Sequence, residues 1–240
     1  MKTLLLALLL NVSAMNALAQ SPYQLIWPRE AALAGGGAMG IGISHLLRPN
    51  TPAFTPAQIA ALDIGQIPAF DRFAARHYFA AARKGSDVLF FSASAVPLLL
   101  LIDPAVRRDA PTVGVITGEV LLLNTALTLL TKELAHRPRP FLYNPAVPLS
   151  DKLDRDARRS FFSGHTSTVA AMTFSTAKIW TDYHPDSQWR PAVWAVAVAI
   201  PATVGYLRMR GGKHFLSDVC VGFVVGAATG WVVPHLHRRK

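Results

Sequence analysis

Three short clusters of charged and histidine residues stand out in a chain that is otherwise poor in charge. Arginine forks and a lysine ammonium can neutralise a doubly charged phosphate, and arginine does so through paired hydrogen bonds. Two histidines and a carboxylate add groups that can attack, donate a proton or orient a partner. The residue types therefore favour chemistry on a phosphoryl group. The clusters are Lys132 with Arg139, then Ser163, Gly164 and His165, and finally Arg208, His214 and Asp218.

The spacing within the clusters assigns each a part in that chemistry. Ser163 and Gly164 precede a predicted helix, whose first N–H groups attract an anion. His214 and Asp218 are four residues apart on another predicted helix, so they share one face. A carboxylate there can hold one imidazole nitrogen and leave the other free to attack phosphorus. His165 is then left to protonate the departing oxygen.

Each cluster by itself has a commoner structural explanation. The lysine and arginine of the first cluster could anchor a membrane edge, and the Ser-Gly pair could cap a helix. A His-Asp pair at this spacing is more often a surface pair. Their joint occurrence in this order favours a single phosphate site. No Asp/Glu cluster of the kind that binds magnesium accompanies them, so neither a metal nor a cofactor is expected.

The composition limits the class of protein that carries these clusters. Of 240 residues, 51% are apolar and only 16% are charged, which excludes a disordered tail protein and a coiled coil. The single cysteine excludes a disulfide scaffold and a four-cysteine zinc site. A net charge of +10 predicts an anionic partner. Because this charge is divided among loops between apolar stretches, nucleic acid is not the expected partner.

The elements that must position the clusters are predicted to be helices. Strand-like alternation is absent, so the apolar stretches indicate an all-α bundle of about five or six mostly apolar helices, embedded in a membrane. Three glycines at spacing four, Gly222, Gly226 and Gly230, offer a ridge for close helix packing. Glu119 and Asn124 lie inside one stretch, where polar groups serve function or bond each other or a neighbouring helix. The stretches are 32–47, 87–102, 112–131, 165–180, 191–207 and 215–233.

The start of the chain is expected to address the protein to the cell envelope. Residues 1–19 have the positive start, apolar run and small-x-small site of a signal peptide, with an uncleaved membrane anchor as the alternative. Residues 20–86 are predicted to form a glycine-rich segment and an interfacial amphipathic region, or a solvated helical face. Residues 87–240 are predicted to form the helical core.

The distribution of basic residues predicts how the core is oriented. Arg107, Arg108 and the basic tail that ends the sequence are expected on the cytoplasmic side. The loops 132–164 and 208–214 then lie on the far side. This agrees with an export signal only if an even number of crossings precedes Lys132. Either 32–47 does not complete a crossing, or the molecule is not a conventional multi-span protein.

The three clusters resemble the signature of the type 2 phosphatidic acid phosphatase superfamily, which includes bacterial acid phosphatases and vanadium haloperoxidases. Its parts are K-x6-R-P, P-S-G-H and S-R-x5-H-x3-D, and the match runs from Lys132 to Asp218. Two positions depart from the pattern. Phe162 stands where the family has proline, and Leu207 stands where it has serine.

The resemblance implies a helical bundle and a role for each matched residue. His214 would be the nucleophile that forms a phosphohistidine, His165 the acid, and Asp218 the partner that orients the nucleophile. No metal is needed for phosphatase work in this family. The phosphate-binding residues would be Lys132, Arg139 and Arg208, assisted by Ser163 and Gly164.

The expected function is that of a phosphatase acting on a lipid of the bacterial cell envelope. The resemblance offers lipid A, undecaprenyl diphosphate, phosphatidylglycerophosphate and phosphatidate as substrates. The protein would lie in a membrane, with its site facing the periplasm. One alternative is a soluble periplasmic acid phosphatase of broad specificity, and a vanadate-dependent haloperoxidase is a weaker one. A membrane lipid-binding or transport protein without catalysis is the alternative from another class.

Overall fold

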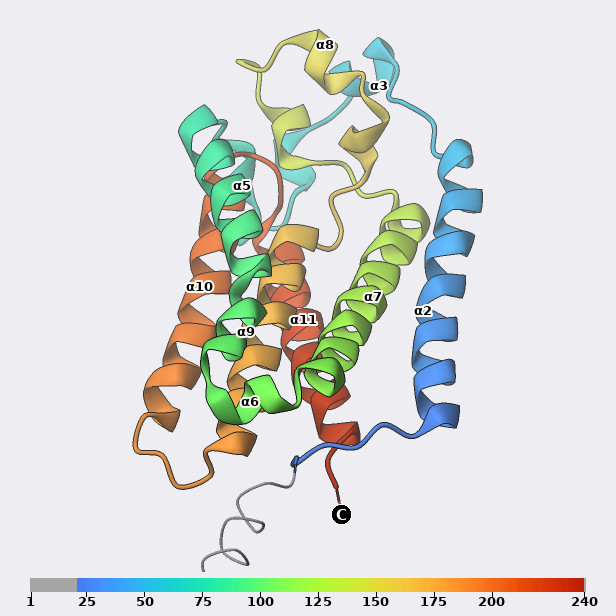
Figure 1. Ribbon diagram of the computed structural model, residues 1–240. Helices are drawn as coiled ribbons and strands as arrows, with labels where there is room; N and C mark the ends of the chain where they lie inside the picture. Colours follow the sequence, from blue (N-terminus) through green and yellow to red (C-terminus); the bar gives the residue numbers. More distant parts are fainter. Residues whose placement is uncertain (1–20, 240) are drawn as a thin grey trace, which may run out of the picture.

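Long helices running side by side make up most of the molecule. The computed structural model describes residues 21–239, so the predicted signal peptide at 1–19 lies outside the described residues. Within this range, strand pairing is limited to one isolated bridge between Tyr23 and Arg238, and the all-α prediction is confirmed. The long segments, shown in Figure 1, are α2 (Trp27–Leu47), α5 (Ala80–Ser94) with η3 (Val96–Ile102), α7 (Ala110–Ala135), α9 (Gly164–Tyr183), α10 (Arg190–Arg210) and α11 (Leu216–Leu236).

Short helical turns lie mainly at one end of the bundle, in the segments that follow α2 and α7 (Figure 1). Proline at a first helical position starts several of them, because its fixed φ suits that place and its missing N–H costs nothing there. Only α6 (Pro104–Arg108) lies at the opposite end. The others are η1 (Arg48–Asn50), α3 (Pro56–Ala60), η2 (Ile64–Gln66), α4 (Arg72–Ala75), η4 (Pro140–Tyr143), α8 (Leu149–Lys152) and η5 (Arg155–Arg158).

The helix α9 lies at the centre and packs against α5, α7, α10 and α11. Its contact with α11 is unusually close, because the predicted glycine ridge faces it. A Cβ added to Gly226 would lie 2.0 Å from the Ser167 carbonyl oxygen, and one on Gly222 would lie 2.6 Å from that of Ser163. Only glycine allows the two backbones to approach so closely. The ridge therefore fixes α9, and with it the start of α9, against α11.

The outward faces of the bundle are apolar. Four helical segments are long and apolar enough to cross a membrane: 80–102, 110–143, 190–210 and 216–236. Most of each segment is not covered by protein. Large apolar side chains such as Phe91, Leu98, Val224 and Trp231 are exposed there. In a bilayer these faces meet acyl chains, which matches the membrane-embedded prediction.

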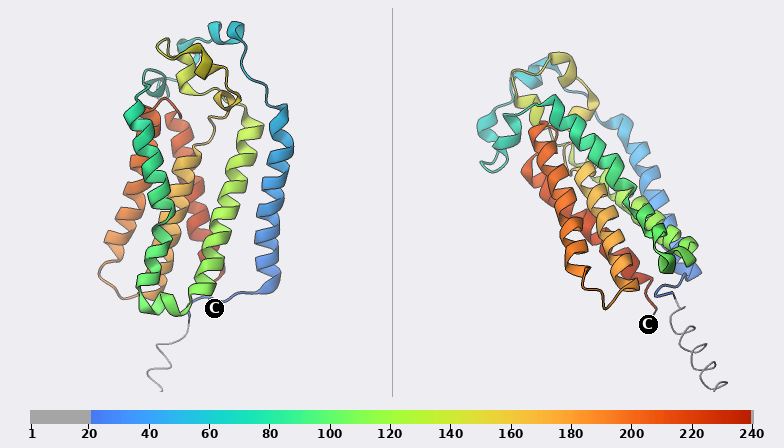
Figure 2. Two further views of the ribbon diagram at one scale, coloured as in Figure 1. Left: turned by 45° about the horizontal axis from the view of Figure 1, so that its top comes forward. Right: turned by 60° about the vertical axis from the view of Figure 1, so that its left-hand side comes forward.

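The N-terminal region contains a long helix that is not among the four segments apolar enough to cross a membrane. The segment 32–47 belongs to the 21-residue helix α2, which runs beside α7 along the bundle (Figure 2). A Cβ on Gly40 would lie 3.0 Å from the Cβ of Ala126, so small residues on both helices let them meet. Three long segments, α2, α5 with η3, and α7, therefore precede the site. The boundary expected at 86/87 falls inside α5, since this helix begins at Ala80.

Candidate active site

The three sequence clusters meet at one end of the bundle, the end opposite to residues 21–26 and 237–239 (Figure 1). The first cluster occupies the end of α7 and the segment after it. The second begins α9, and the third spans the end of α10, a short turn and the start of α11. Direct contacts join them: the Ser163 N–H donates to the Asp218 carbonyl oxygen at 3.0 Å, and Arg139 Nη1 lies 3.3 Å from His214 Nε2. The sequence separation of the latter two residues is 75 positions.

His214 is held in one tautomer by its neighbours. Its Nδ1 lies 2.7 Å from the Ser160 carbonyl oxygen, which can only accept a hydrogen bond. Nδ1 therefore carries the proton, and Nε2 keeps its lone pair toward Arg139. The side chain is 1% exposed. Burial, with the nearby cations Arg139 and Lys132, holds the pKa of His214 well below its usual value, so the ring is neutral at pH 7.

Asp218 supports His214 less directly than the spacing predicts. Its Oδ2 is 3.8 Å from His214 Nδ1, beyond a hydrogen bond. The same oxygen accepts hydrogen bonds from Ser160 Oγ at 2.5 Å and from the Phe215 N–H at 2.9 Å. Asp218 also pairs with Arg137. The carboxylate therefore fixes Ser160 and the first turn of α11, and the Ser160 carbonyl in turn orients the imidazole.

Arg139 and Lys132 are buried beside this imidazole. Arg139 donates to the carbonyl oxygens of Asp156 and Lys213, at 2.8 and 2.9 Å, and pairs with the Asp156 carboxylate at 2.8 Å. Lys132 donates from Nζ to the Arg159 carbonyl oxygen at 2.8 Å. These bonds hold both cations in fixed positions. A preorganised cluster of this kind can stabilise an anion at little reorganisation cost.

The second histidine, His165, belongs to a separate hydrogen-bonded group of charged side chains at the same end of the bundle. Its Nε2 lies 2.9 Å from Asp87 Oδ1, and Arg208 Nη1 donates to that same oxygen at 3.0 Å. The His165 ring also packs on Phe90, with centroids 4.4 Å apart. His165 and Asp87 are partly exposed, whereas Arg208 is buried. This part of the site is therefore the part open to the surroundings.

The start of α9 presents backbone N–H groups to the site. Of the two expected donors, Ser163 and Gly164, the N–H of Ser163 is already bonded within the protein. The Ser163 N–H donates to the Asp218 carbonyl oxygen at 3.0 Å, and the Ser163 side chain caps the helix through the Thr166 N–H. Among residues 21–239, the N–H groups of Gly164 and His165 have no acceptor. A Cβ on Gly164 would lie 2.9 Å from Thr128 Cγ2, so a larger residue would push this turn away from Lys132.

Lys213 adds a cation that the sequence clusters do not include. Burial and the charges of Arg139 and Arg208 lower its pKa to about 8. Its side chain lines a cavity of about 240 Å³ together with Tyr78, Phe141 and Asp156. Like-charged groups crowd each other here, and a bound dianion would relieve that repulsion. The cavity itself is also lined by the carboxylates of Asp151, Asp154 and Asp156, so the place that suits an anion is beside Arg139 and Arg208.

Three positions that bear on the site escape sequence reasoning. Asp87 lies in an apolar stretch more than 70 residues before His165, and Ser160 acts largely through its carbonyl oxygen, which any residue has. Arg137 lies between Lys132 and Arg139 of the first cluster, and its position in the sequence does not show what it contacts. In the structure it bridges Asp218 and Asp71. Only Asp87 leaves a sequence signal, as an acid interrupting an apolar run.

Comparison with known proteins decides the family. The model of the PAP2 superfamily matches residues 113–240, which include all three clusters and more than half of the chain. The chain belongs to the PAP2 superfamily. The family resemblance drawn from the three clusters is thus confirmed.

The chain is also similar to two individual proteins, one by sequence and one by structure. A Schizosaccharomyces pombe protein named "Probable diacylglycerol pyrophosphate phosphatase 1" is 30% identical over 129 residues, which are 48% of this chain and 46% of the relative. The match thus spans less than half of that relative's length. A solved structure of a transmembrane PAP2 type phosphatidylglycerolphosphate phosphatase from Bacillus subtilis superposes with a TM-score of 0.53. It is 22% identical and covers 83% of this chain and 94% of its own, which shows a shared fold.

Groups able to hold a metal lie elsewhere in the described part of the chain. Within residues 21–239, converging His, Cys, Asp and Glu ligand atoms are found in one group, Glu30, Glu119 and His237. The start of α2 and the end of α11, which carry Glu30 and His237, lie at the end of the bundle opposite to the candidate active site (Figure 1). The expectation of a metal-independent reaction remains a prediction.

Proposed function

We propose that this PAP2 protein is a membrane phosphatase that hydrolyses a phosphate ester or diphosphate of a lipid through a phosphohistidine. The observation that carries this proposal is the neutral, buried His214 imidazole, whose Nδ1–H is fixed by the Ser160 carbonyl. Its Nε2 lone pair is left facing the guanidinium of Arg139. A nucleophile beside a fixed cation is the arrangement that phosphoryl transfer requires.

The reaction proceeds in two balanced steps. His214 Nε2 attacks the terminal phosphorus, an N–P bond forms, and the bond from that phosphorus to the leaving oxygen breaks; this is the lipid's ester oxygen in a monoester and the bridging oxygen of the departing lipid monophosphate in a diphosphate. His165 gives its proton to that departing oxygen. In the second step water attacks phosphorus, His165 takes the proton from this water, and the N–P bond breaks to release inorganic phosphate. The second step therefore restores the free imidazole of His214.

The cations hold the phosphoryl oxygens through both steps. Lys132, Arg139 and Arg208 are all buried and positioned by hydrogen bonds before any substrate arrives. The Gly164 N–H adds a donor at the positive end of α9. Asp218 acts as a positioning residue, since it fixes Ser160 rather than touching the imidazole.

A lipid is the proposed substrate because the open part of the site adjoins an apolar surface. Asp87 and His165 are partly exposed, and Val88 and Phe91 on the same helix expose 64% and 72% of their surface. A lipid lying along α5 would bring its headgroup to His165. The relatives' names point to glycerophospholipid monophosphates and diphosphates, and the sequence resemblance adds undecaprenyl diphosphate and lipid A.

Phosphate release by detergent-purified protein tests this function. The panel is phosphatidate, phosphatidylglycerophosphate, diacylglycerol pyrophosphate, undecaprenyl diphosphate and lipid A, each with EDTA present. We expect release from at least one lipid, lost in His214→Ala and in His165→Ala. His45→Ala, which removes an exposed histidine of α2, is the matched control and keeps activity. Release that survives in His214→Ala would end the phosphohistidine proposal.

The lipid panel and a high-salt extraction of membranes separate the alternative functions. A non-catalytic lipid-binding or transport protein would bind a lipid and release no phosphate in any variant. A soluble acid phosphatase would leave membranes in high salt without detergent. The four apolar segments favour retention in the membrane.

We further propose that the site faces the periplasm of a bacterial envelope. Arg107, Arg108, Arg238 and Arg239 lie at the opposite end, and short basic segments favour the cytoplasmic side. This orientation places residue 21 in the cytoplasm as well, so it requires that 1–19 does not deliver residue 20 across the membrane. A cleaved export signal followed by three crossings would give the reverse.

Cysteine labelling distinguishes the two orientations. In a Cys220→Ser background, Ser150→Cys places an exposed thiol at the site end, and Gln188→Cys places one in the turn between α9 and α10. We expect an impermeant maleimide to label Ser150→Cys in intact cells and Gln188→Cys only after permeabilisation. The opposite pattern would show that the site faces the cytoplasm.

A further inference from the structure

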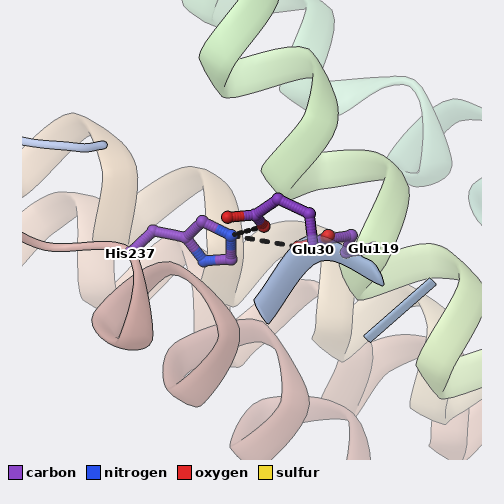
Figure 3. A group of neighbouring side chains, drawn as sticks. All are labelled: Glu30, Glu119 and His237. Carbon is purple, nitrogen blue, oxygen red and sulfur yellow. Dashed lines mark hydrogen bonds and ion pairs between the residues drawn. The ribbon is translucent and has the colours of Figure 1, made fainter. Parts of the chain in front are cut away.

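A second group of ionisable side chains lies at the end of the bundle far from the phosphate site. Glu30 comes from the first turn of α2, Glu119 from α7, and His237 from the residue after α11 (Figure 3). The ligand atoms of the three side chains all lie within 4.8 Å of one another. Their positions in the sequence are about 90 to 207 residues apart, so the fold alone brings them together.

The imidazole of His237 points its free nitrogen at both carboxylates. Its Nδ1 lies 2.7 Å from the Val233 carbonyl oxygen, which can only accept a hydrogen bond, so Nδ1 carries a proton. Nε2 lies 2.7 Å from Glu30 Oε2 and 3.1 Å from Glu119 Oε2, so it can hydrogen-bond a carboxylate when it carries a proton and can offer a lone pair to a metal when it does not. The ring is fully buried. Three electron-pair donors thus converge on one point, as Figure 3 shows.

Glu119 is the member whose charge is least compensated. It is 5% exposed, and neither of its carboxylate oxygens has a hydrogen-bond donor among residues 21–239. Arg29 pairs with the other oxygen of Glu30, at 2.8 Å, and so neutralises that carboxylate only. A buried carboxylate without a partner is strongly unfavourable. Apart from His237 itself, Arg29 is the cation that residues 21–239 pair with this group, and it pairs with Glu30 and not with Glu119.

We propose that Glu30, Glu119 and His237 bind a divalent transition-metal ion of the Zn²⁺ type. One imidazole nitrogen and two carboxylates form a donor set that suits such an ion better than Mg²⁺ or Ca²⁺, which prefer oxygen ligands alone. Zn–N and Zn–O bonds of about 2.0–2.2 Å place tetrahedral ligand atoms roughly 3.3 Å apart. The observed 2.7 and 3.1 Å need only a small opening to reach that spacing.

The Val233 carbonyl completes the case for a coordinating imidazole. A metal-binding histidine usually donates its other ring N–H to a carbonyl or carboxylate, which fixes the ring and raises its basicity. His237 already has this arrangement. The ion would tie the start of α2 to α7 and to the end of α11, where the Tyr23–Arg238 bridge also joins the two ends of the described chain. Its effect would be on stability, since the phosphate site lies at the other end.

Metal content and thermal stability of the purified full chain test this site. The protein is dialysed against EDTA, then given one equivalent of ZnCl₂, desalted and assayed for zinc. We expect about one zinc per chain and a higher Tm with zinc than without. Glu119→Gln keeps the size of the side chain and should bind no zinc, with its Tm insensitive to the ion.

Control variants separate this site from other surface ligands. His235→Ala removes an exposed histidine from the last turn of α11, and it should bind zinc as the parent does. Equal zinc binding by the parent and Glu119→Gln would overturn the proposal, as would no binding by the parent. If the parent binds no zinc, a proton shared among the three side chains balances their charge, and the Tm of the parent depends on pH and not on zinc. Phosphate release in EDTA is measured on the same samples, so failure here and failure of the phosphatase are told apart.

Discussion

Asp87 links His165, the proposed general acid, and Arg208, a proposed phosphate-binding residue, and replacing it with asparagine should move binding and turnover in opposite directions. Its Oδ1 is 2.9 Å from His165 Nε2 and 3.0 Å from Arg208 Nη1. The substitution keeps the size of the side chain and removes the charge. Arg208 is then free to bind phosphate, while His165 loses the carboxylate that holds it.

The size of each effect follows from exposure and bond type. The Asp87 carboxylate is 49% exposed, so its pair with Arg208 contributes about 1 kcal/mol, and loss of that competition should lower the Ki of inorganic phosphate about fivefold. A hydrogen bond to a charged group contributes about 1.5 kcal/mol, so turnover should fall by roughly tenfold.

Steady-state phosphate release, with inorganic phosphate as competitive inhibitor, measures both quantities. Asp63→Asn, which changes an exposed carboxylate that caps a short turn, is the matched control and should alter neither. A purely structural role would lower the Tm and leave kcat and Ki of the folded fraction unchanged. An unchanged or weaker affinity for phosphate would refute the idea that Asp87 competes with it for Arg208.

Two further predictions concern packing and pH. Gly226→Ala places a Cβ 2.0 Å from the Ser167 carbonyl oxygen and should destabilise the fold by about 1–3 kcal/mol in thermal unfolding, whereas Gly42→Ala, with no atom within 4 Å, should be neutral or stabilising. Because burial and neighbouring cations lower the pKa of Lys213 to about 8, its charge is lost as pH rises through that value. KM for a lipid phosphate should therefore rise above about pH 8 in the parent, and this rise in KM should be absent in Lys213→Met. The same rise in Lys213→Met would show that Lys213 is not its cause.

The candidate site residues could be identified from their short-range spacing in the sequence. The spacing of four residues kept Asp218 near His214, although His214 lies just before α11 (Leu216–Leu236) and not on it, so the two do not share a helix face as predicted. A Ser-Gly pair before a helix presents the first turn of that helix. The same holds for the long apolar runs, whose length and lack of alternation predict helices whatever they pack against. His214 and the start of α9 therefore followed from the sequence.

Tertiary structure decided the contacts whose partners are far apart in the chain or act through the backbone. The orientation of His214 depends on the Ser160 carbonyl, 54 residues away, and that of His165 on Asp87, 78 residues away. No residue type marks a backbone acceptor, and one acid in an apolar run does not name its partner. The passage of α2 beside α7 likewise depends on small residues of two helices meeting.

The group at Glu30, Glu119 and His237 shows the same division. The sequence marks Glu119 as a polar residue in an apolar stretch, because burying a carboxylate in such a place is costly. It cannot show that residues near both ends of the chain come together there, since helix packing sets that meeting over 207 positions. Local chemistry is written in residue spacing, whereas long-range juxtaposition results from how the helices pack.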